Sequence, residues 1–153
     1  MDTEKEQLNK RRRATRELLM QLVYQMDMTG DFSDAARKKF LDEHSGEISV
    51  SEPDFKYFNT YLAAVRENYA AIDERIASAS DNWKLSRIAK VDLAILRLSV
   101  AEMTSPGDKN PIPHRVSINE AVELAKKYAG DNSPGFVNGI LGKIECSLSK
   151  SAN

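Results

Sequence analysis

The chain has 153 residues, of which 41% are hydrophobic and 29% charged, and its net charge is −1. This length and composition suit one folded domain that needs no metal or disulfide, and they exclude a wholly disordered chain. The sequence holds no run of about 18 to 20 apolar residues, so we expect no membrane span and a cytoplasmic location. The single cysteine, Cys146, and two distant histidines, His44 and His114, lack the spacing of a zinc site, so we expect no metal and no cofactor.

The first segments have the hydrophobic spacing of helices. Leu18, Leu22 and Met26 share one face of a helix predicted over about residues 11–28, which Gly30 ends. A short helix is expected over residues 34–43. Residues 1–10 have an acidic bias, and we expect them to form a flexible extension before a single helical domain of residues 11–148.

The middle of the chain contains the longest apolar stripe. Apolar residues from Phe55 to Ile76 recur at steps of three and four, which predicts one helix with Ser51 as its N-cap. Another helix is expected over about residues 87–103, before a loop rich in proline and glycine over residues 106–113.

Two capping signals mark the last helices. Ser117 and Glu120 have the spacing of a capping box, which predicts a helix start near Ser117. Ser133 followed by Pro134 predicts the start of a closing helix that reaches Leu148. Because the sequence contains no long alternating pattern typical of strands, the predicted fold class is all-α.

A basic cluster stands out near the N-terminus. Five cations occupy seven positions: Lys10, Arg11, Arg12, Arg13 and Arg16. A solvated helix face is the ordinary explanation of such a run, but cations in the first turns of a helix are each disfavoured by roughly 0.3 to 1 kcal/mol, which favours a bound anion. Arginine pairs bidentately with phosphate and stacks on bases, which favours RNA, although an acidic partner protein also fits. Tyr24, two turns beyond Arg16, could stack on a base or equally be an aromatic at the edge of the core.

Four segments resemble one protein family in the same order. Residues 11–24 resemble the N-terminal helix of the NusB family of transcription antitermination factors, and residues 92–103 resemble its central helix. Residues 112–128 are the most specific match, and residues 136–141 follow them. The resemblance implies two three-helix bundles packed against each other, with about seven helices. It also implies a protein without catalytic activity that pairs with ribosomal protein NusE and binds boxA RNA of nascent ribosomal transcripts in the transcription elongation complex.

The resemblance further implies roles for single residues. The arginine-rich RNA-binding motif of the family corresponds to Arg12, Arg13 and Arg16, and the cluster adds Lys10 and Arg11. Tyr24 matches the aromatic at the far end of this motif and is assigned to RNA and partner binding. Asp92 falls near the junction with NusE and is assigned to partner binding. Asn132, where aspartate is frequent, and Phe136 match residues implicated in RNA contact, although the stripe of Phe136 with Ile140 favours core packing.

Two other functions stay open. The chain could be a protein-interaction module whose arginines hold an acidic helix, or a stand-alone relative of the N-terminal domain of ribosomal RNA cytosine methyltransferases. The sequence contains no Gly-rich cofactor loop and no catalytic cysteine motif, which argues against an enzyme. Binding to about four phosphates of a single strand predicts that log K falls with log salt at a slope of roughly −3, whereas a flat response favours the interaction module.

Overall fold

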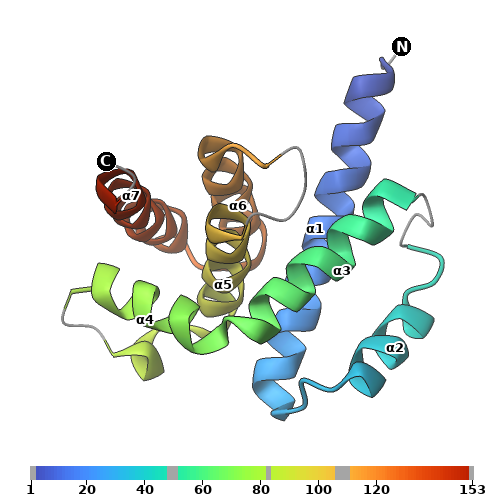
Figure 1. Cartoon of the computed structure of the whole chain (residues 1–153), viewed down its shortest axis with the longest axis horizontal. Helices are drawn as coiled ribbons and strands as arrows, with labels where there is room; N and C mark the ends of the chain where they lie inside the picture. Colours follow the sequence, from blue (N-terminus) through green and yellow to red (C-terminus); the bar gives the residue numbers. More distant parts are fainter. Residues whose placement is uncertain (1–2, 48–51, 82–83, 106–110, 152–153) are drawn as a thin grey trace.

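The computed structural model describes residues 3–47, 52–81, 84–105 and 111–151. Within these ranges the chain forms seven α-helices and one short 3-10 helix, without a strand, so the predicted all-α class is confirmed (Figure 1). The elements are α1 (Glu4–Thr29), α2 (Asp34–Glu43), α3 (Glu52–Glu67), α4 (Tyr69–Ala79), η1 (Leu85–Arg87), α5 (Lys90–Thr104), α6 (His114–Tyr128) and α7 (Ser133–Ser151). None of the described helices combines the length and low polarity needed to cross a bilayer.

The helices form two groups around α5. Helices α1, α2 and α3 form the first group, and α5, α6 and α7 form the second, as the resemblance implied (Figure 1). Helix α4 follows α3 and packs against α5 and α7. Residues 92–103 of α5 are all buried, because this helix also contacts α1, α3 and α6. The two groups therefore share one continuous core.

Helix α1 begins at Glu4, seven residues before the predicted start. The Thr3 hydroxyl accepts a hydrogen bond from the backbone N–H of Glu6 at 3.2 Å, and the Glu6 carboxylate accepts one from the N–H of Thr3 at 3.1 Å. This capping box starts the helix and places two acids in its first turn, where the helix dipole favours them. The basic cluster therefore lies two turns inside α1, and the argument that an anion must offset a dipole penalty is wrong for these cations.

Two other predicted boundaries are corrected. The stripe from Phe55 to Ile76 is divided between α3 and α4 at Asn68, whose side-chain amide donates to the carbonyl of Ala64 at 3.0 Å and competes with the helical backbone. Helix α6 begins at His114 rather than near Ser117, because the Ser117 hydroxyl is buried and bonded to a carboxylate of α5. The predicted N-cap Ser51 lies outside the described residues.

Candidate nucleic-acid interface

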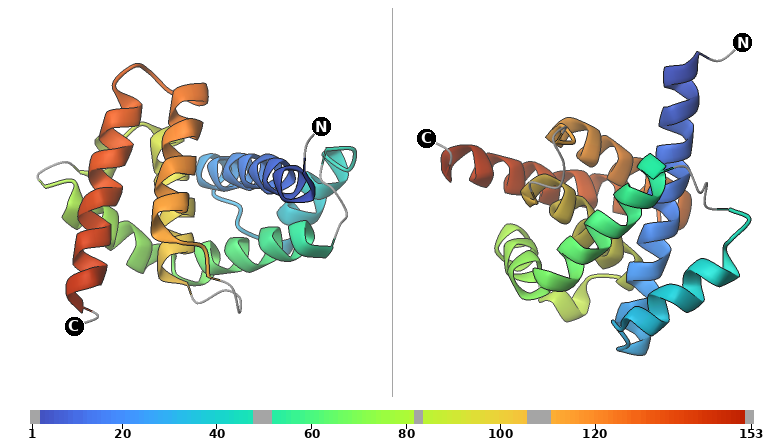
Figure 2. Two further views of the ribbon diagram at one scale, coloured as in Figure 1. Left: turned by 90° about the horizontal axis from the view of Figure 1, so that it is seen from above. Right: turned by 45° about the vertical axis from the view of Figure 1, so that its right-hand side comes forward.

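The five cations of the basic cluster have different environments on α1. Lys10, Arg11 and Arg13 are exposed, Arg12 is half-buried and Arg16 is buried. The first turns of α1, which lead up to this cluster, project beyond the other helices (Figure 2). The structure thus keeps three of the five predicted RNA-binding cations fully at the surface.

Arg16 is only 5% exposed. Its guanidinium donates two hydrogen bonds to the carboxylate of Glu102 on α5, at 2.9 and 3.1 Å. Burial alone would lower the pKa of Arg16, but the neighbouring Tyr57 and the Glu102 carboxylate outweigh it and raise that pKa, so the side chain stays charged. Arg16 therefore belongs to the core, and its contact with RNA stays a prediction.

Glu102 is itself the centre of a buried polar network. Besides Arg16, its carboxylate accepts hydrogen bonds from the hydroxyls of Tyr57 on α3, at 2.7 Å, and Ser117 on α6, at 2.9 Å. All four residues are less than 6% exposed. The network joins four helices, α1, α3, α5 and α6, directly beneath the exposed cations.

The other arginines touch the neighbouring helices without being buried. Arg13 donates two hydrogen bonds to Glu120 of α6, at 2.8 and 2.9 Å, yet its side chain stays 61% exposed. Arg11 lies 3.9 Å from the carboxylate of Asp54 on α3. The guanidinium of Arg12 stacks over the buried ring of Tyr57 at 4.5 Å, and its Nε atom is buried without a hydrogen-bond partner in the part of the chain that the structure describes. These contacts orient the arginines and leave them within reach of solvent.

A seam between α1 and α6 continues from the basic cluster. The Tyr128 hydroxyl donates to Glu17 and accepts from the side-chain amide of Gln21 at 2.9 Å, and the Lys127 ammonium lies 2.6 Å from Glu17. Tyr24 is half-buried against the core and lies about 20° around α1 from Arg13, so it shares the face of Arg13 more closely than that of Arg16. The seam thus combines cations with two aromatic rings.

The remaining predicted residues meet at a separate pocket of about 420 Å³. Asp92 from the first turn of α5 lines it together with Asn132 and Phe136 at the start of α7, although these segments lie about 40 residues apart in the chain. Phe136 is half-buried and packs against the core, as the apolar stripe predicted, while it also lines the pocket. Three residues separate Tyr128 at the end of the seam from Asn132.

Asp92 is buried without full compensation. Its Oδ2 atom accepts a hydrogen bond from the Ser133 hydroxyl at 3.2 Å, whereas its Oδ1 atom is buried without a hydrogen-bond partner. Burial raises the pKa of this carboxyl, and the Ser133 hydrogen bond opposes the rise only in part. A buried acceptor that lacks a donor fits a surface completed by a partner.

We expect the Asp92→Asn variant to be more stable than the parent at pH 7, by about 1 kcal/mol, since the neutral amide avoids the cost of burying an incompletely paired charge, which exceeds that of a neutral polar group. The folded pKa lies above the unfolded one, so the carboxylate costs stability at neutral pH and costs nothing where both states are protonated. The advantage should therefore shrink as the pH falls toward the ordinary carboxyl pKa of 3.8, as urea unfolding at several pH values would measure. Asp131→Asn, at an exposed position, is the matched control, and a less stable Asp92→Asn at pH 7 would contradict the expectation.

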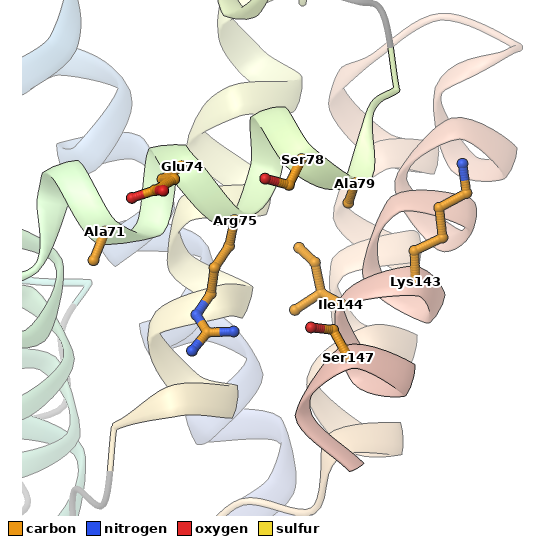
Figure 3. Close-up of a pocket in the computed structure, with 8 residues that line it drawn as sticks. All are labelled: Ala71, Glu74, Arg75, Ser78, Ala79, Lys143, Ile144 and Ser147. Atoms are coloured by element: carbon orange, nitrogen blue, oxygen red, sulfur yellow. The ribbon is translucent and has the colours of Figure 1, made fainter. Parts of the chain in front are cut away.

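A further hollow of about 510 Å³ lies between α4 and α7 (Figure 3). Arg75 extends from α4 and Lys143 from α7, while Ala79 and Ile144 provide apolar surface between them. Figure 1 places these two helices on the side of the molecule away from α1. This hollow is therefore separate from the basic cluster and includes none of the predicted site residues.

Comparison with known proteins decides the family. Residues 13–145 match the NusB family along nearly the whole folded region. The chain belongs to the NusB family. It is 45% identical over 133 residues to the transcription antitermination protein NusB of Acetivibrio thermocellus, and the match covers 87% of each chain.

Solved structures agree with the NusB assignment. The NusB structure of T. maritima is 32% identical and superposes with a TM-score of 0.74, covering 87% of this chain and 89% of that one. A chain in a crystal structure of the antitermination factors NusB and NusE with double-stranded RNA is 24% identical, with a TM-score of 0.76 and coverage of 90% and 98%. The latter likeness establishes a shared NusB fold.

Several residues of this NusB surface were not predicted from the sequence. Glu120 was interpreted only as half of a capping box, and Tyr128 was assigned no role, whereas both lie on the seam beside α1. Lys127 pairs with Glu17 across 110 residues of sequence. The local sequence signal for this basic site was the pair Lys126 and Lys127 in the last turn of α6.

Proposed function

We propose that this chain is an RNA-binding transcription antitermination factor that pairs with ribosomal protein NusE and binds boxA-type RNA of nascent ribosomal transcripts. The observation that carries the proposal is the NusB family match over residues 13–145. It would act within the transcription elongation complex in the cytoplasm, by binding and without catalysis.

The exposed side of α1 supports the RNA part of this proposal. Lys10, Arg11 and Arg13 offer cations to phosphates within about one turn of one helix. Tyr24 and Tyr128 offer rings on which unstacked bases of a single strand can pack. Cations beside aromatic rings are the combination that single-stranded RNA requires.

The pocket at Asp92 supports the partner part of the proposal. Asp92 lines this pocket with a carboxylate that, among the described residues, only the Ser133 hydroxyl pairs, so a basic or hydroxyl-bearing side chain of NusE in the pocket would compensate its charge. Asn132 and Phe136 line the same pocket and would contact RNA at its edge. RNA and protein would then meet at the end of the seam.

The direct test is a titration of boxA-type RNA against a scrambled RNA of the same length, with and without purified NusE. We expect at least about 10-fold preference for boxA, equivalent to about 1.4 kcal/mol, and tighter binding with NusE present. Equal affinity for both RNAs, together with a flat salt response, would instead support the protein-interaction module. The NusB relative matches along 87% of its own length, which argues against a methyltransferase fragment.

Glu120 should compete with RNA for Arg13. In the free protein its carboxylate occupies the two donors of Arg13 that a phosphate would need. We expect Glu120→Gln to bind RNA about 3-fold more tightly, in line with the roughly 0.2 to 1 kcal/mol of an exposed ion pair. Fluorescence anisotropy would measure the change, with Glu43→Gln at an exposed position of α2 as control, and weaker binding by Glu120→Gln would show that the carboxylate positions Arg13 instead.

A further inference from the structure

A cleft of about 860 Å³ lies between the first turns of α1 and the start of α6. Its α1 wall includes Lys5, Lys10 and Arg12, and its opposite wall includes Pro113 and Val116. The volume is within the range of about 300 to 1,000 Å³ that is typical of ligand pockets. Lys10 and Arg12 belong to the basic cluster, whereas Lys5, Pro113 and Val116 have no role in the proposed RNA interface.

The two walls differ in chemistry. The α1 wall is basic, and Glu6, an acid on it, has a carboxylate oxygen that accepts from the N–H of Thr3. Glu120, on the facing wall, is paired with Arg13. Val116 is 37% exposed although its side chain is apolar. A nucleotide has the same two parts, since its phosphate needs cations and its base needs an apolar face.

The basic wall is an addition to the part of the chain that the family shares. The family match begins at residue 13, whereas Lys5, Asn9 and Lys10 precede it. These residues lie on the helical turns that the Thr3 capping box adds to α1 and that project beyond the other helices (Figure 2). Without these turns the α1 wall would keep only Arg12, Arg13 and Arg16.

We propose that this cleft binds one further nucleotide of the RNA strand, with its phosphate at Lys5 and Lys10 and its base against Pro113 and Val116. The inference rests on the proposed function, because the cleft continues the exposed cations of α1 at Arg13. Charge complementarity selects an RNA strand over an apolar peptide segment as the occupant. The stretch of RNA that the protein contacts then extends one nucleotide beyond one end of the boxA element.

The test compares the affinity for a boxA core RNA with that for the same RNA extended by one to three nucleotides at its 5′ or 3′ end. For the parent protein we expect one of the two extensions to raise the affinity about 5-fold, and an abasic extension to give only part of this gain. Lys5→Glu and Val116→Glu should each abolish the gain and keep most of the affinity for the core RNA. Both changes put an acid near a helix N-terminus, where it is tolerated, so unfolding would not explain the loss.

Lys39→Glu on α2 is the control, because it changes the net charge as Lys5→Glu does at an exposed position away from the cleft. The ratio of the two affinities is the readout, which removes the general effect of charge on RNA binding. Core RNA that binds without any gain from either extension, or a gain that survives both cleft variants, would overturn the cleft proposal alone. Failure of the core RNA to bind would overturn the proposed function as well.

Discussion

Replacing Glu102 with alanine is expected to lower the free energy of unfolding by about 3 to 5 kcal/mol, because removal of one partner leaves the other charge of a buried pair without compensation. Arg16 is 5% exposed and bonds through two nitrogens to this carboxylate. The hydroxyls of Tyr57 and Ser117 would lose their acceptor at the same time. Urea unfolding followed by circular dichroism at neutral pH measures the loss.

A double variant distinguishes the lost pair from lost packing. Arg16→Met combined with Glu102→Leu removes both charges and fills similar volume, so it should recover the part of the loss that comes from the unpaired Arg16 charge. The hydroxyls of Tyr57 and Ser117 still lack their acceptor in this variant, so the recovery should be incomplete. Glu123→Ala, at an exposed position of α6, should change the free energy of unfolding by less than about 0.5 kcal/mol. If Glu102→Ala unfolds at the same urea concentration as the parent protein, the network does not stabilise the fold.

Replacing Lys10, Arg11 and Arg13 together with alanine is expected to weaken boxA binding about 100-fold, if each phosphate contact contributes roughly 1 kcal/mol. The slope of log K against log salt should become shallower by about 2, since each lost contact to a single strand removes about 0.7. Thermal unfolding should change little, because all three cations are exposed and the contact of Arg11 with the buried carboxylate of Asp54 is long, at 3.9 Å.

The matched control removes three exposed cations elsewhere: Lys38, Lys39 and Lys150. It lowers the net charge by the same amount, so it measures how far general electrostatic attraction contributes to RNA binding. We expect the control to weaken binding only a few-fold at physiological salt, where the screening length is about 8 Å. Equal losses in the two triple variants would show that the α1 cations have no specific part in the interface.

The comparison of Arg13 with Arg16 shows what the sequence could not predict. Both belong to one short basic run, yet Arg16 is a core residue because it pairs with the buried carboxylate of Glu102. Glu102 lies 86 residues further along the chain. No local pattern reports such a distant pair. The sequence near Thr3 did contain a usable signal, since Thr3 and Glu6 have the spacing of a capping box. The helix was located by its apolar periodicity, which begins only later in the chain, so its start was predicted too late.

Other features followed directly from local sequence. The short helix α2 has the predicted bounds because Ser33 caps it, accepting from the N–H of Ala36 at 3.1 Å, and Gly30 ends α1 in the left-handed conformation. The family resemblance assigned Asp92, Asn132 and Phe136 to binding sites, and these three residues line one pocket in the structure. Their roles in RNA and partner binding stay predictions.

The position of the Glu102 carboxylate also determines how the molecule comes apart. Side chains from α1 and α3 in one helical group and from α6 in the other bond to the same two oxygens. Detachment of either group breaks the hydrogen bonds from Arg16 and Tyr57 to Glu102 and exposes the apolar core that both groups share, so an intermediate with one half intact is disfavoured. The protein should consequently unfold in a single cooperative transition, and a destabilising substitution in either helical group should lower the midpoint of that one transition.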